Sequence, residues 1–245
     1  MRVFKKILYI LFVLMFVLSL CCCIVLSISS STILTFTNNE TSRRRFFYTS
    51  YNNISNSNAL TIISKSPYVL GEKGQFSEDT ISCEVKVEKG NNEYTCSMIS
   101  KLYDADSSLI RTSYFPGDGY KYTITKGNDT QTKDVYSNTN LVKYFSSLVG
   151  GVVKYLSYLT LDNKTIKDNS VVYDTSTTFN ISTFSLSKNI DVKYLDNSKD
   201  KIINLGFDKN DYVTKVKDVN NEATISLNYK KTNFNFALLK EYKGN

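Results

Sequence analysis

The sequence predicts an α+β protein, in which an antiparallel β-sheet is covered by one amphipathic helix and preceded by one N-terminal transmembrane helix. Three observations predict this architecture. Residues 7–26 are almost entirely apolar. From about residue 59 onward, apolar residues mostly recur at every second position, which is typical of strands with one buried face. Residues 138–160 instead place apolar residues three and four positions apart, which indicates a helix.

The apolar segment 7–26 contains a single polar side chain, Ser19. An apolar helix of about 20 residues spans the roughly 30 Å core of a bilayer. Arg2, Lys5 and Lys6 precede the segment, and positive charge on that side favours a cytoplasmic N-terminus. We therefore expect a protein of the cell membrane, in contact with the lipid bilayer, whose main domain is extracytoplasmic.

Three consecutive cysteines, Cys21, Cys22 and Cys23, lie inside this segment. They fit two interpretations: attachment points for lipid, or small apolar residues that fill a membrane helix. The stretch Leu18-Ser19-Leu20 has the apolar start of a bacterial lipobox but lacks the small residue that directly precedes a lipidated cysteine. Retention as a signal anchor, cleavage within Ser27–Ser31, and lipidation are all compatible with the sequence.

The chain divides into three predicted parts. Residues 1–36 form the membrane anchor or signal segment. Residues 37–58 form a polar tether, because they are rich in Asn and Ser and show no clear period. Residues 59–245 form the extracytoplasmic domain.

The composition argues against two functional classes. The chain contains no histidine, the most common general base and metal ligand, and its other polar side chains form no catalytic constellation. We therefore predict no catalytic residues, no metal and no cofactor, and a protein that is not an enzyme. Residues 46–245 hold 24 of the 30 basic and 22 of the 23 acidic residues, so the net charge of +7 falls mostly on the flanks of the apolar segment. We therefore expect no nucleic-acid partner.

The clearest hairpin covers residues 81–98. A two-residue turn at Lys89-Gly90 places Cys83 opposite Cys96 in a non-hydrogen-bonded pair, where facing side chains approach most closely. This spacing permits a structural disulfide, which would suit an exported protein. The alternative is a pair of free, buried cysteines that face each other by accident.

Further strands are predicted on both sides of the helix. The first set consists of Leu109–Phe115, Tyr120–Ile124 and Thr132–Tyr136, with a turn at Pro116–Gly119. The second set consists of Val171–Asp174, Thr178–Leu186, Ile203–Phe207, Tyr212–Val219 and Ile225–Tyr229, and Phe234 and Phe236 continue its alternation. These segments predict a closing meander of short antiparallel strands.

The helix predicted over 138–160 carries one apolar stripe. Its main members are Leu141, Phe145, Leu148, Val152 and Leu156. Two interpretations fit: an ordinary helix that covers the core, or a helix over the open face of a sheet in which these five residues line a cavity. Gly150-Gly151 costs about 1 kcal/mol per residue relative to Ala, which indicates a break or a close packing point.

Three stretches carry a family resemblance: Tyr114-Phe115-Pro116-Gly117-Asp118-Gly119-Tyr120-Lys121-Tyr122, Phe207–Tyr212 and Ile225–Tyr229. With these stretches, the order of the elements resembles that of the LolA-like superfamily of bacterial lipoprotein carriers. The likeness is strongest to membrane-anchored lipoproteins of low-GC Gram-positive bacteria, and it covers roughly residues 60–238. It implies a curved, unclosed half-barrel whose concave face is covered by helices. It also implies an apolar ligand, such as a lipid or lipoprotein. A cell-envelope scaffold or adhesion module without a small ligand is the alternative.

Overall fold

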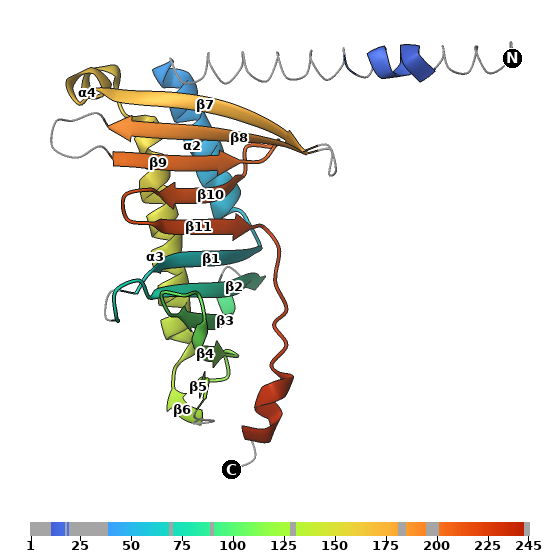
Figure 1. Cartoon of the computed structure of the whole chain (residues 1–245), viewed down its shortest axis with the longest axis vertical. Coiled ribbons are helices and arrows are strands. Elements are labelled where there is room, and N and C mark those ends of the chain that lie inside the picture. The colour runs from blue at the N-terminus through green and yellow to red at the C-terminus, as the bar shows by residue number, and fades with distance from the viewer. Residues whose placement is uncertain are drawn as a thin grey trace, which may run out of the picture.

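The computed structural model describes residues 11–17, 19, 39–68, 71–88, 91–127, 131–180, 185–194 and 201–242. These residues form an antiparallel sheet of eleven strands with two long helices packed on one face (Figure 1). The strand order is β6-β5-β4-β3-β2-β1-β11-β10-β9-β8-β7, and no pairing between described residues joins β6 to β7. The sheet is therefore open, and the predicted α+β class with a large antiparallel sheet is confirmed.

Two meanders make up the sheet. The first contains β1 (Ala59–Pro67), β2 (Phe76–Glu88), β3 (Asn91–Tyr103), β4 (Leu109–Phe115), β5 (Tyr120–Thr125) and β6 (Gln131–Val135). The second contains β7 (Val171–Asn180), β8 (Ser185–Tyr194), β9 (Lys201–Phe207), β10 (Val213–Asp218) and β11 (Ala223–Asn228). They join where β1 pairs with β11, with Ile62 opposite Leu227.

One predicted strand is placed differently. The sequence predicts a single strand over Thr178–Leu186, whereas Thr178 lies near the end of β7 and Leu186 near the start of β8. β8 itself was not predicted as a complete strand. Its inward residues Ile190 and Val192 are apolar, but Lys188 also faces that side, opposite Phe207, and this weakens the alternation.

The helices comprise α2 (Glu40–Ser55), α3 (Asn138–Leu156), the short 3₁₀ helix η1 (Ser157–Thr160), α4 (Asn163–Asp168) and η2 (Ala237–Tyr242). In Figure 1 both α2 and α3 lie behind the strands, so they cover the same face of the sheet. α3 contacts β1, β2, β3 and β9, and α2 contacts η1. The prediction of one helical segment over 138–160 therefore matches α3 followed by η1.

The core lies between this helix-covered face and the two long helices. Alternate strand residues supply it, including Ile62, Ile81, Leu205 and Val216, which are buried almost completely. These four residues come from four different strands, so the core extends across both meanders. Burial of apolar area at about 25 cal/mol per Å² is the main stabilising contribution of such a layer.

Residues 37–58 are not the polar tether that the sequence predicts, because most of them form α2. The side chain of Asn39 caps the helix by accepting a hydrogen bond from the backbone N–H of Ser42. The inward residues Arg43, Ser50 and Ile54 recur at helical spacing, and Phe46 packs on Phe207 of β9 at 4.6 Å between ring centroids. Because two of the inward side chains are polar, the pattern of apolar residues alone does not show the helical period. The folded domain thus begins with α2.

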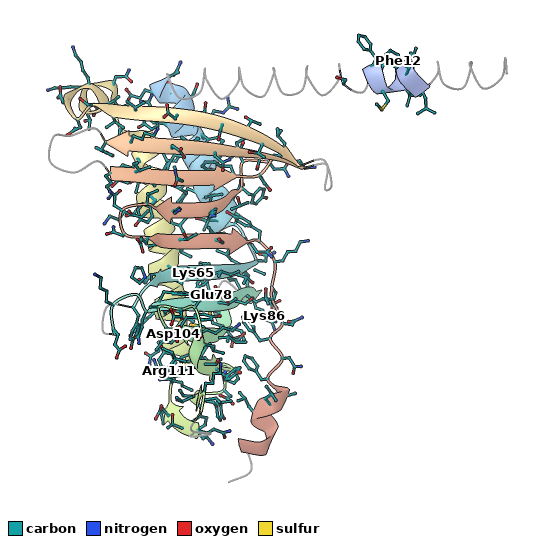
Figure 2. The ribbon with its side chains drawn as sticks, viewed as in Figure 1. Phe12, Lys65, Glu78, Lys86, Asp104 and Arg111 are labelled. Atoms are coloured by element: carbon teal, nitrogen blue, oxygen red, sulfur yellow. A yellow bond between two sulfur atoms is a disulfide. The ribbon has the colours of Figure 1, made fainter. Side chains whose placement is uncertain are left out.

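Of the predicted membrane segment, only residues 11–17 and 19 are described. They are helical, and the side chains of 11–17, such as Phe12 in Figure 2, are exposed. Among the described ranges, no helix is long and apolar enough to cross a membrane. Cys21, Cys22 and Cys23 lie outside the described residues.

The opposite face of the sheet is crossed by the C-terminal segment, residues 229–242, which descends from β11 to η2 (Figure 1). Thr61 donates a 2.7 Å hydrogen bond to the carbonyl of Lys230, and the backbone N–H of Thr232 donates to Ser82 at 2.9 Å. Leu239 is fully buried. The predicted alternation at Phe234 and Phe236 therefore belongs to an irregular strap and not to a strand.

Candidate functional site

The candidate site is the contact between α3 and the sheet, and it begins at the first residue of the helix. Ser137 is the N-cap, and it accepts a hydrogen bond from the backbone N–H of Asn140. Asn138, the first residue of α3, ties the helix to β3. Its side chain accepts from the N–H of Cys96 at 3.2 Å and donates to the carbonyl of Tyr94 at 2.9 Å.

The five apolar residues predicted to line a cavity all belong to this contact. Leu141, Val152 and Leu156 have no exposed surface, and Phe145 is 9% exposed. Leu148 is half-buried and packs against the same core cluster. The structure therefore places all five residues toward the sheet, and whether they line a cavity for a ligand stays a prediction.

Cys83 on β2 and Cys96 on β3 lie near the start of α3, where Asn138 accepts a hydrogen bond from the backbone of Cys96. They are directly opposite each other in the β2–β3 register, with Glu88 facing Asn91 at the turn. Their Cα atoms are 4.2 Å apart, which suits a non-hydrogen-bonded pair, and a disulfide joins them. Both residues are buried in the core cluster, so the bond has a structural role.

A carboxylate faces α3 from β2. The hydroxyl of Tyr144 donates a 2.5 Å hydrogen bond to Oδ2 of Asp79. Burial raises the pKa of Tyr144 well above its ordinary value, and the charge of Asp79 raises it further. The other oxygen of this carboxylate, Oδ1, is buried and has no hydrogen-bond partner among the described residues.

A second carboxylate faces α3 from β10. The hydroxyl of Tyr155 donates to Oδ2 of Asp218 at 3.0 Å, and Asn221 donates to Asp218 from its backbone and from its side chain. Burial alone would raise the pKa of Asp218, but the hydrogen bonds from Asn221 and Tyr155 outweigh it and hold that pKa below the ordinary value. Burial and the bond to Asp218 raise the pKa of Tyr155 to about 12.

The two glycines lie between these tyrosines on the helix. Gly150 is exposed, and a Cβ atom built on it would meet nothing within 4 Å. A Cβ atom on Gly151 would lie 3.8 Å from Cδ1 of Ile225, which is half-buried on β11. Ile225 occupies the same row across the sheet as Ser64 and Asp79. The middle of α3 therefore packs closely on this part of β11, because a single added carbon would already be in van der Waals contact with Ile225.

Arg43 fixes α2 against the segment that joins η1 to α4. Its guanidinium donates to the carbonyl of Leu161 at 2.9 Å and to Oδ1 of Asn163 at 3.3 Å, and it lies 5.1 Å from the ring centre of Tyr173. The side chain is 1% exposed. Arg43 therefore belongs to the folded domain, whereas the charge pattern of the sequence places it on the flank of the membrane segment.

Sequence reasoning missed the polar members of this contact. Both aspartates occupy inward strand positions. Asp79 lies two residues before Ile81 on β2, and Asp218 lies two residues after Val216 on β10. The sequence signal for these two residues was a carboxylate at a position that the strand alternation assigns to the buried face. Tyr144 and Tyr155 are eleven residues apart, about three helical turns, and flank the apolar stripe. Within the described ranges, no group of three or more Cys, Asp or Glu residues could hold a metal ion.

Comparison with known proteins gives distant likenesses. No family model matches the chain, and no curated protein matches its sequence. The chain is similar to the crystal structure of lipoprotein LppX of Mycobacterium tuberculosis, at 11% identity and a TM-score of 0.40, over 80% of this chain and 100% of that one. It is also similar to a beta-barrel-like protein of domain of unknown function DUF1849 from Brucella abortus, at 10% identity and a TM-score of 0.20, over 72% and 98%. Likenesses this distant assign neither a family nor a function to the chain.

Proposed function

We propose that the protein is a membrane-anchored, extracytoplasmic domain that binds an apolar chain, such as the acyl chain of a lipid or lipoprotein, between α3 and the sheet. The observation that carries this proposal is the glycine pair at the centre of α3, where Gly151 lies over Ile225 between two hydrogen-bonded points of the helix. An acyl chain is long and thin, and it gains about 0.8 kcal/mol for each CH₂ group that it buries.

Two observations support the extracytoplasmic location. The apolar segment 7–26 follows three basic residues, which is the pattern of an exported domain with a cytoplasmic N-terminus. The disulfide between Cys83 and Cys96 is of the kind that persists in oxidising compartments. Both observations favour a domain held at the outer surface of the membrane.

The way in which α3 is held favours entry of a ligand at its centre. Tyr144 bonds to Asp79 near one end of the helix, and Tyr155 bonds to Asp218 near the other. Between them, Gly150 and Gly151 lower helix stability by about 1 kcal/mol each relative to Ala. The helix therefore bends most easily where Ile225 lies beneath it. Movement there would expose Leu148 and Ile225 to an incoming apolar chain.

Photocrosslinking of the full chain in lipid nanodiscs, with a diazirine-labelled fatty acid as the probe, tests this proposal. We expect crosslinks within 144–156 and 223–228. Gly151→Leu should abolish them because the new side chain would occupy the position over Ile225 that the proposal gives to the ligand. Gly150→Leu is the matched control, because its side chain points into open solvent and makes the same change in helix propensity.

The outcomes separate the proposed function from its alternative. Crosslinks confined to residues 1–36 in the wild-type chain would contradict an apolar site in the domain. A cell-envelope scaffold or adhesion module would then be the remaining candidate function. Equal labelling of the Gly151→Leu and Gly150→Leu variants would place the ligand away from the centre of α3.

A further inference from the structure

The outward side of α2 carries aromatic rings that the fold leaves exposed. Tyr48 is 59% exposed and Tyr51 is 41% exposed, whereas Arg43, Ser50 and Ile54 on the inward side are buried. Spacings of three and four along α2 place Tyr48 and Tyr51 beside Arg44 on one stripe. Two large aromatic side chains on a single helix surface form a patch that needs a structural or functional reason.

The rings are held in place before any partner arrives. Phe47 is half-buried against the core cluster, and its ring lies 5.3 Å from that of Tyr48 and 6.1 Å from that of Tyr51, between centroids. The pair Phe47 and Tyr51 is stacked. Since the tyrosines rest on a fixed ring, little conformational entropy is lost when they contact a second surface.

The charge beside the rings is positive. α2 contains three arginines and a single acidic residue, Glu40. Arg44 is half-exposed and pairs with Glu40 at 2.9 Å, and Arg45 is exposed without an acidic neighbour in the helix sequence. A stripe of tyrosine flanked by arginine matches the interface of a bilayer, where aromatic rings lie at the level of the headgroups and basic side chains meet anionic phosphates.

The length of the connection between the predicted membrane segment and α2 also favours the bilayer as the partner. The predicted membrane segment ends at residue 26, and α2 begins at Glu40. A connection of this length spans at most roughly 50 Å even when fully extended, at about 3.3–3.6 Å per residue. The first turn of α2 therefore lies within roughly 50 Å of the bilayer that the proposed anchor would enter.

We propose that the outward face of α2, formed by Arg44, Arg45, Tyr48 and Tyr51, docks on the anionic lipid surface of the membrane that holds the protein. This inference rests on the membrane anchoring in the proposed function and adds the surface through which the domain meets the lipid. Because α2 and α3 cover the same face of the sheet, docking through α2 turns the helix-covered face toward the bilayer (Figure 1).

The absence of tryptophan from the chain allows a direct test. A Tyr48→Trp variant carries the only indole in the protein, and so does the control Tyr120→Trp on β5, whose tyrosine is 39% exposed at the other end of the sheet. Each full-length variant is reconstituted into phosphatidylglycerol–phosphatidylcholine vesicles with brominated acyl chains, which quench indoles at the lipid. We expect a blue shift and a loss of emission for Tyr48→Trp, and neither change for Tyr120→Trp.

Two further arms complete the experiment. In the first arm, the vesicles contain only phosphatidylcholine with the same brominated acyl chains. In the second arm, the changes Arg44→Gln and Arg45→Gln are added to Tyr48→Trp. Each arm should restore much of the lost emission of Tyr48→Trp. A chain that does not float with the vesicles would overturn the membrane anchoring itself. A chain that floats, but whose Tyr48→Trp emission is no more quenched than that of Tyr120→Trp, would overturn the docking face alone.

Discussion

The hydroxyl of Tyr155 on α3 donates a hydrogen bond to the carboxylate of Asp218 on β10 at 3.0 Å. Three helical turns earlier, Tyr144 makes the same kind of bond to Asp79 on β2. The covering helix is thus attached to the sheet at two points by polar contacts, although its main stripe is apolar. Such contacts fix the position of the helix on the sheet more sharply than apolar packing does, because a misplaced helix would take the Tyr144 donor from Asp79 and one of three donors from Asp218.

Asp218→Asn should destabilise the protein by about 1–3 kcal/mol at neutral pH, because the carboxylate accepts hydrogen bonds from Tyr155 and twice from Asn221. These bonds hold the pKa of folded Asp218 below its ordinary value of 3.8. Their contribution is therefore present above pH 3.8 and is lost as the pH falls through the lower pKa of the folded state. Urea unfolding at neutral and acidic pH should show wild type and variant converging in acid. A gap in stability that is independent of pH would contradict this account.

Arg43→Leu should destabilise the domain by about 1–3 kcal/mol, because it leaves the part-buried carbonyl of Leu161 without its donor. Arg44→Leu is the matched control. Its side chain is half-exposed and its ion pair with Glu40 lies at the surface, so the change should stay within about 0.5 kcal/mol. Denaturant unfolding of both variants compares them. Equal losses would show that Arg43 acts only as a surface charge.

Replacing Cys83 and Cys96 together by serine should destabilise the domain by about 3 kcal/mol, since the disulfide closes a loop with a sequence separation of 13. The bond itself is checked by mass spectrometry of the peptide that contains both cysteines, which should gain alkyl groups only after reduction. Alkylation of this peptide in the unfolded, unreduced protein would show that the cysteines are free.

Leu239→Ala tests the strap across the outer face. Leu239 is fully buried, so the variant should lose about 2–5 kcal/mol in the stability of the strap, whereas Leu238→Ala, at a neighbour that is 69% exposed, should change little. Hydrogen exchange within 229–242 measures the effect locally. If the two variants exchange alike, the strap does not depend on its contact with the sheet.

Much of the fold follows from local patterns. The alternation around Lys89-Gly90 predicts the register that sets Cys83 opposite Cys96, and spacings of three and four predict α3. α2 is different, because buried Arg43 and Ser50 find partners just after η1, on α4 and near β10 that are more than a hundred residues away. A polar residue that is satisfied by distant partners resembles a solvent-exposed one in sequence. The same reason hides Asp79 and Asp218.

The pairing of β1 with β11 also has a consequence for biogenesis. The first strand of the sheet lies in its middle, and the last strand completes it, with Ile62 opposite Leu227. A chain that emerges N-terminus first during synthesis can assemble each meander from sequential hairpins, but the inner edge of β1 stays unpaired until residues 223–228 have emerged. A free edge of this kind is a template for pairing with other chains. Premature termination before β11 should therefore yield an aggregating product and not a smaller stable domain.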